Sequence, residues 1–133
     1  MLLHGYTGSG QSMAGVARLL EHDCETLAPD LPGHGRTVLE PVPAAYDFDA
    51  CLRRLLATLE SAGHRRADWL GYSMGARLAL GCAVRHPDSV ASLVLLAGRA
   101  GIEDPAERTA RRGADEALAA RIESRGVEAF VDE

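Results

Sequence analysis

Short apolar runs recur along the first 97 residues and alternate with longer segments of helical spacing. The runs predict four strands, at residues 1–3, 25–28, 67–70 and 90–96, the last covered on both faces. The segments between them predict helices at 12–22, 47–63 and 74–86, capped by Ser12, by Asp47 or Asp49, and ended by Gly63 or Pro87. Strands that alternate with helices form a parallel sheet with right-handed crossovers. The pattern therefore predicts an α/β fold.

The pattern changes at Glu103. An Arg- and Ala-rich amphipathic helix is predicted from Asp104-Pro105 to about Ser124, and a second helix begins after Gly126. Because no strand separates these helices, we interpret them as a lid inserted over one end of the sheet. The predicted division is residues 1–102 for the core and 103–133 for the start of a helical lid.

Composition places the chain among soluble globular proteins. It has 133 residues, of which 47% are hydrophobic and 25% charged. A net charge of −5 gives no global attraction for nucleic acid or anionic membranes. No leader-like or membrane-length apolar segment is present, which favours the cytoplasm. Three cysteines without ligand spacing predict buried free thiols and neither a metal nor a cofactor.

Candidate chemistry centres on Gly71-Tyr72-Ser73-Met74-Gly75. A strand predicted just before Ser73 and a helix just after it would hold the serine hydroxyl outward on a sharp turn, with glycines giving clearance. The alternative is a glycine-rich turn with an incidental serine. A nucleophilic serine needs donors for developing negative charge. The backbone N–H groups of Met74, at the helix N-terminus, and of Tyr6, in the loop after the first strand, are the candidates for an oxyanion hole.

The base that would activate Ser73 is harder to place. His86 is the one histidine downstream, but thirteen helical positions put it roughly 20 Å from Ser73, beyond the reach of a base. His4 and His34 follow strand ends, where such sheets place their chemistry, yet turn motifs explain both, so each stays open as a base. Two further histidines, His22 and His64, are interpreted as solvated helix ends.

Three segments together resemble the α/β-hydrolase superfamily: Leu3–Ser9 (LHGYTGS), Asp30–Gly35 (DLPGHG) and Gly71–Gly75. Within it, Ser73–Leu80 and the segment from Gly101 to Glu133 resemble the menaquinone-pathway synthases that form 2-succinyl-6-hydroxy-2,4-cyclohexadiene-1-carboxylate. The resemblance covers essentially the whole chain. It departs at Ala76, where a second glycine is common, and at residues 98–101, where the family more often has a proline before the glycine.

The resemblance implies a lyase that eliminates pyruvate from 2-succinyl-5-enolpyruvyl-6-hydroxy-3-cyclohexene-1-carboxylate, with catalytic Ser73 activated by a later His/Asp pair. Because this small-molecule substrate carries three carboxylates, guanidinium groups suit its binding. Arg77, one turn after Ser73, Arg111 on the lid helix, and Tyr72 are the implied substrate-binding residues. For Arg111 the alternative is a solvated face paired with Glu107 or Asp115. Arg108 and Arg112 are expected at the surface.

Members of this family are about twice as long as the chain, and their catalytic Asp and His lie on later strands. We therefore expect the sequence to be a piece of a longer protein, and the 133-residue chain to be inactive and poorly soluble because a half-sheet exposes an edge. Two other functions remain open: a serine carboxylesterase or carbon–carbon bond hydrolase, and a non-catalytic ligand-binding module. The oligomeric state is not predicted.

Overall fold

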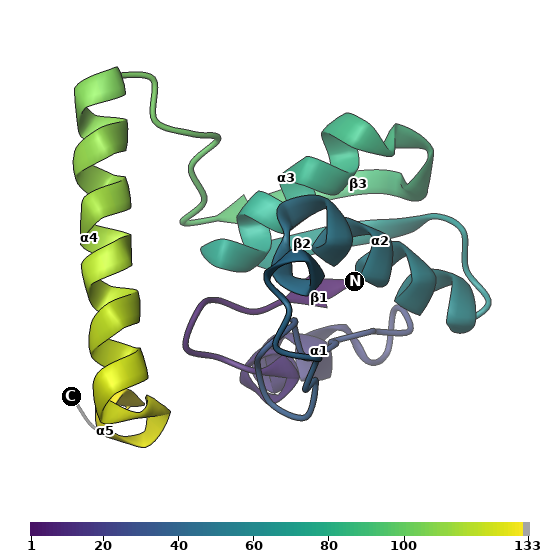
Figure 1. Ribbon diagram of the computed structural model, residues 1–133. Coiled ribbons are helices and arrows are strands. Elements are labelled where there is room, and N and C mark those ends of the chain that lie inside the picture. Colours follow the sequence, from purple (N-terminus) through teal and green to yellow (C-terminus); the bar gives the residue numbers. More distant parts are fainter. Residues whose placement is uncertain (132–133) are drawn as a thin grey trace. The chain divides into compact units, whose positions relative to one another are not determined.

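The computed structural model describes residues 1–131. Its contacts group the chain into two compact units, Met1–Arg99 and the residues from Ala100 onward. The first unit holds three parallel strands, β1 (Leu2–Leu3), β2 (Ala67–Tyr72) and β3 (Val90–Leu96), in the order β1-β2-β3 (Figure 1). The predicted α/β fold is confirmed, and β2, which leads to the candidate serine, is the central strand.

Three α-helices belong to this unit: α1 (Ala14–Leu20), α2 (Phe48–Ser61) and α3 (Met74–Arg85). Helix α3 packs against the sheet and beside α2, whereas α1 lies below β1 in the view of Figure 1. Gly63, with φ of 86°, follows the end of α2, as expected for a glycine after a helix. Asp47 is the N-cap residue of α2, but its side chain makes no capping hydrogen bond.

Short 3₁₀ turns extend these elements at Gly10–Met13, Pro43–Tyr46 and Pro87–Ser89. The first of them corrects the helix predicted to start at Ser12. Met13 is the N-cap residue of α1, and the Ser12 hydroxyl instead accepts a hydrogen bond from the N–H of Ser9 at 3.0 Å. The serine thus stabilises the turn that leads into α1.

Two strand predictions need correction. Residues 25–28 form no strand, because β1 offers two residues and makes one backbone hydrogen bond to this segment, from the Leu2 N–H to the Leu27 carbonyl at 2.7 Å. Strand β3 was expected to be covered on both faces, but it is an outer strand of the described sheet, and Val94, Leu95 and Leu96 are 46%, 39% and 46% exposed. An apolar run alone does not distinguish a central strand from an outer one.

The core of the first unit forms where α2 and α3 meet the sheet. Trp69, the single tryptophan of the chain, is 1% exposed, and its indole N–H donates to the Ser89 carbonyl at 3.0 Å. Around it pack the buried side chains of Leu3, Leu31, Leu52, Leu55, Leu59, Leu78 and Cys82. This core fixes β2 against α3, the two elements that flank Ser73.

The cysteines differ in environment. Cys51 and Cys82 are buried, and burial raises the pKa of the Cys82 thiol to about 11. Cys24 is exposed, so the expectation of a buried thiol was wrong for this residue. Within residues 1–131, no cluster of His, Cys, Asp and Glu could hold a metal ion, and no helix has the length and apolar character needed to span a membrane.

The second unit consists of α4 (Pro105–Arg125) and α5 (Val127–Val131). Asp104 caps α4, because its carboxylate accepts a hydrogen bond from the Ala106 N–H at 2.8 Å, and Pro105 occupies the first helical position. Gly126, with φ of 86°, ends the helix. The first predicted helix is therefore present within about a residue of its expected bounds, and the second begins after Gly126 as predicted. Its expected end at Glu133 lies outside the described residues.

Candidate active site

Ser73 lies between the end of β2 and the start of α3, with φ of 52° and ψ of −108°. A non-glycine residue in such a conformation costs of order 1–3 kcal/mol and persists where its surroundings enforce it. Here β3 enforces it in part, because the Ser73 N–H donates to the Leu96 carbonyl at 2.8 Å. The predicted sharp turn is thus present at Ser73.

Two glycines make this turn possible. A Cβ on Gly75 would overlap the carbonyl oxygens of Leu3 and His4, the latter at 2.6 Å. A Cβ on Gly71 would overlap the backbone at the start of α3, 2.6 Å from the Ala76 Cα. This close approach allows the Gly75 N–H to donate a hydrogen bond to the His4 carbonyl at 3.1 Å. This bond ties the start of α3 to the end of β1.

Ala76, which departs from the pattern of the resembling proteins, packs against Gly98 just after β3. Ala76 is 1% exposed, and a Cβ on Gly98 would lie 2.6 Å from its methyl group. Gly98 therefore provides the space that the Ala76 side chain occupies.

The loop after β1 reaches the serine. A Cβ on Gly5 would lie 3.6 Å from the Ser73 Cβ. The Gly5 carbonyl oxygen contacts the His4 Nδ1 at 2.7 Å and accepts a hydrogen bond from the Gly8 N–H at 3.0 Å. Because the peptide group is planar and trans, holding this oxygen also sets the direction of the Tyr6 N–H on the same peptide. The oxyanion-hole candidate is therefore held by two hydrogen bonds.

A cavity of about 580 Å³ opens beside Ser73. It is lined by His4, Gly5, Tyr6, Thr7, Gly8, Ser12, Met13, Val16, Tyr72, Ser73 and Leu96. The lining mixes hydroxyl groups with apolar side chains and includes no Asp, Glu, Lys or Arg among the described residues. Of the predicted site residues, the cavity brings together Tyr6, Tyr72 and Ser73. Met74 follows Ser73 at the start of α3.

Neither of the two predicted arginines is among the lining residues of this cavity. Arg77 is exposed on α3 and does not line the cavity. Arg111 belongs to the second unit, where its Nε donates to both carboxylate oxygens of Asp115 at 2.8 and 2.9 Å. This contact is the surface pairing that sequence spacing offered as the alternative for Arg111.

His4 has a structural role rather than that of a base. Its ring is buried, and its Nε2 accepts a hydrogen bond from the Leu31 N–H at 3.0 Å, which requires Nδ1 to carry the hydrogen and donate to Gly5. Burial is the main cause that lowers the pKa of His4, because the charged ring is disfavoured away from water.

The other histidines also lie apart from the serine hydroxyl. Both ring nitrogens of His34 contact backbone carbonyl oxygens, those of Pro32 and Tyr6. His22 and His64 are exposed, and His86 follows the last residue of α3, the opposite end from Ser73. Within residues 1–131, therefore, no histidine hydrogen-bonds to Ser73.

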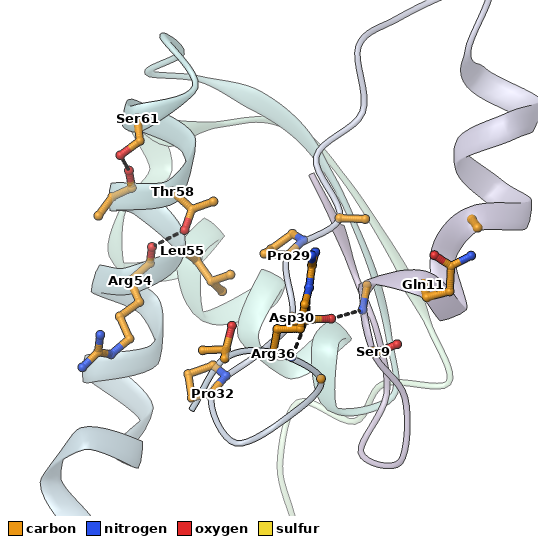
Figure 2. Close-up of a pocket in the computed structure, with 16 residues that line it drawn as sticks. Ser9, Gln11, Pro29, Asp30, Pro32, Arg36, Arg54, Leu55, Thr58 and Ser61 are labelled. Carbon is orange, nitrogen blue, oxygen red and sulfur yellow. Dashed lines mark hydrogen bonds and ion pairs between the residues drawn. The ribbon is translucent and has the colours of Figure 1, made fainter. Parts of the chain in front are cut away.

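Sequence reasoning missed the part played by Asp30. Its carboxylate accepts hydrogen bonds from the Gly10 N–H at 2.7 Å and the Arg36 N–H at 3.0 Å, as the dashed lines in Figure 2 show. These bonds lower the pKa of Asp30, since they favour its charged form. The signal was an aspartate two positions before the Pro- and Gly-rich turn at residues 32–35.

A larger cavity of about 1300 Å³ lies between this turn and α2 (Figure 2). The hydroxyls of Thr58 and Ser61 in its wall donate to helix carbonyls at 2.9 and 2.7 Å. The start of the 3₁₀ turn Gly10–Met13 lies in its wall, but the Gly10 N–H is already bonded to Asp30. None of its lining residues is a non-glycine residue with positive φ, so we place the candidate chemistry at Ser73.

A strained serine between a parallel strand and a helix, beside a loop that presents backbone N–H groups, is typical of one class of enzymes. The model of the α/β hydrolase fold family matches residues 1–116, and the chain belongs to this family.

Similar proteins carry the name of the synthases that the motifs resemble. The chain is 38% identical over 110 residues to the 2-succinyl-6-hydroxy-2,4-cyclohexadiene-1-carboxylate synthase of Pectobacterium atrosepticum, covering 82% of the chain and 42% of that protein. It is 35% identical to the synthase of Yersinia pestis, covering 98% of the chain and 47% of that protein. The solved structure of MenH from S. aureus covers 98% of the chain and 49% of that protein, with a TM-score of 0.87 and 27% identity. The chain thus spans about half the length of these relatives.

We predict that Gly75→Ala destabilises the protein by at least about 2 kcal/mol, because the methyl group overlaps backbone oxygens that cannot move away cheaply. The matched control is Gly15→Ala in α1, where nothing lies within 4 Å of the added Cβ. This control should stabilise by about 0.5–1 kcal/mol. Urea unfolding measures both. Equal effects of the two substitutions would contradict the close approach at Gly75.

We predict that His4 makes the stability of the protein pH-dependent. Its folded-state pKa is lowered, so the unfolded chain takes up a proton near pH 6.5 before the folded one does. The contribution of His4 to the unfolding free energy is complete above about pH 6.5 and is lost as the pH falls toward the folded-state pKa of His4. The unfolding free energy should therefore fall more steeply in the wild type than in His4→Gln between about pH 7.5 and 5.5. Parallel curves for the two proteins would refute this role.

Proposed function

We propose that the protein eliminates pyruvate from 2-succinyl-5-enolpyruvyl-6-hydroxy-3-cyclohexene-1-carboxylate to form 2-succinyl-6-hydroxy-2,4-cyclohexadiene-1-carboxylate. The observation that carries the proposal is the strained Ser73 beside the Gly5–Tyr6 peptide, in a chain whose curated relatives are synthases of that product. The complete activity also requires a base for Ser73, which the described residues do not bring to it.

The positions of the double bonds define the reaction. The substrate has one ring double bond, at C3, and the product has two, at C2 and C4. A proton therefore leaves C2, the C2–H electron pair forms the C2–C3 double bond, and the original double bond moves to C4–C5. The C5–O bond breaks, and the enolpyruvyl group leaves as the enolate of pyruvate, which then takes up a proton.

This chemistry explains the use of an oxyanion hole. The C2 carbon lies next to the carbonyl group of the succinyl chain, so loss of its proton places negative charge on that oxygen. The N–H groups of Tyr6 and Met74 are the proposed donors to this oxygen, since fixed backbone donors stabilise charge without reorganisation. Ser73, activated by a histidine, takes the proton. The described residues that line the cavity include no Asp, Glu, Lys or Arg, which supports strong hydrogen bonds of this kind.

Carboxylate recognition is assigned to arginines. Three carboxylates need cations, and the cavity lining supplies none among the described residues. Arg77 and Arg111 are the proposed partners, with Tyr72 contributing its exposed ring at the cavity wall. A guanidinium suits this role because it binds a carboxylate through two parallel hydrogen bonds.

The test uses the protein encoded by the complete reading frame that contains these residues. We expect it to release pyruvate from the substrate, and Ser73→Ala to lower kcat by about 10²- to 10⁴-fold, because a positioned acid–base group contributes about that much. Ser61→Ala, an exposed serine on α2, is the control. Faster turnover of p-nitrophenyl esters than of the substrate would instead establish a carboxylesterase. Binding without turnover of either would establish a ligand-binding module.

Substituting Arg111 separates its two possible roles. Arg111→Ala should raise KM by at least about tenfold with little change in kcat, because a charged hydrogen bond to the substrate contributes about 1.5–3 kcal/mol. Arg112→Ala, one position away and expected at the surface, should leave both constants unchanged. An unchanged KM for Arg111→Ala would show that its pairing with Asp115 is its whole role.

A further inference from the structure

The turn at residues 29–36 contacts the loop after β1 at three separate points. The Leu31 N–H donates to His4, the Gly10 N–H donates to Asp30, and His34 contacts Tyr6. The bonded residues are 20 to 28 positions apart in sequence, so these bonds exist only in the folded protein. Two of the three end on a histidine that could have served as a base.

His34 is held on several sides. Its Nδ1 lies 3.0 Å from the Pro32 carbonyl oxygen, and its Nε2 contacts the Tyr6 carbonyl oxygen. Its ring centroid lies 5.2 Å from that of His4 and 6.1 Å from that of Tyr6. A carbonyl oxygen only accepts hydrogen bonds, so each of these contacts is a hydrogen bond only where that ring nitrogen carries a hydrogen. A neutral ring carries one hydrogen, and its placement on Nε2 makes the Tyr6 contact the donation.

Tyr6 is therefore fixed through both of its peptides. The preceding peptide is held at the Gly5 oxygen by His4 and Gly8, and the following peptide is held at the Tyr6 oxygen by His34. Rotation about the backbone bonds of Tyr6 changes the relative direction of these two oxygens. Holding the Tyr6 oxygen therefore restricts the backbone rotation that the contacts at the Gly5 oxygen leave free.

We propose that His34 is a positioning residue, which holds the Tyr6 N–H in the direction needed to stabilise an oxyanion at Ser73 by donating from Nε2 to the Tyr6 carbonyl oxygen. This proposal rests on the proposed function, which names the substrate. Its test also works without that substrate, because any reagent that builds negative charge at Ser73 uses the same donors.

The experiment compares two amides at position 34 in the protein encoded by the complete reading frame. In His34→Gln the amide nitrogen extends about as far as Nε2 and still reaches Tyr6. In His34→Asn it extends only as far as Nδ1 and does not. His22→Ala, an exposed histidine on the surface, is the control. The readouts are the rate at which a fluorophosphonate labels Ser73, and kcat and KM for the synthase substrate.

We expect His34→Asn to slow labelling and lower kcat by about tenfold or more, with KM changed by less than about threefold, since a misdirected oxyanion donor weakens transition-state binding. His34→Gln should restore most of both rates. Equal rates for Asn, Gln and wild type would overturn the proposal, as would equal losses in Asn and Gln.

Two further outcomes separate this inference from the proposed function. A wild-type protein that is labelled at Ser73 but does not turn over the synthase substrate would remove the proposed function, while labelling of the variants still decides the role of His34. A wild-type protein without labelling or turnover would overturn both. If the variants fail to fold, the nitrogen-15 spectrum of the wild-type ring decides, because an Nε2 without hydrogen would refute the donation to Tyr6.

Discussion

The site depends on one close approach, that of the start of α3 to the end of β1. The backbone of Gly75 lies so near the carbonyl oxygens of Leu3 and His4 that no side chain fits between them, and the Gly75 N–H donates to His4. The chain must therefore turn sharply at Ser73, which accepts φ of 52° as a result. The same contact places the Gly5–Tyr6 peptide beside the serine. The proposed nucleophile and the proposed oxyanion donors thus depend on one packing constraint.

Histidines that follow strand ends are usually considered first as bases, but here His4 and His34 contact the backbone. His4 uses one ring nitrogen to accept from Leu31 and the other to donate to Gly5. His34 directs both of its nitrogens at carbonyl oxygens. A ring whose nitrogens are already bonded in this way would have to break a hydrogen bond before it could take a proton from Ser73. For His4 that bond is buried, which makes breaking it costly.

The sequence predicted those features that depend on neighbours along the chain. The elbow at Ser73, the cap at Asp104 and the ends of α2 and α4 follow from local periodicity and from Gly, Pro and Asp signals. The strand at 25–28 and the covering of β3 were predicted wrongly, because both depend on what lies beside a strand. The contacts of Asp30 and His34 were missed for the same reason, since their partners lie 20 and 28 residues away.

The proposed substrate and the cavity differ in charge, and the difference indicates how binding and chemistry are divided. A lining of hydroxyl and apolar groups, without Asp, Glu, Lys or Arg among the described residues, favours charge development in the proposed transition state but offers no cation to a tricarboxylate in the ground state. The proposed function assigns that binding to an arginine such as Arg111, which would exchange Asp115 for a substrate carboxylate. The exposed pair with Asp115 contributes at most about 1 kcal/mol. A charged hydrogen bond to a bound ligand contributes about 1.5–3 kcal/mol, so the proposed exchange requires that the ligand carboxylate be better shielded from water than the exposed Asp115.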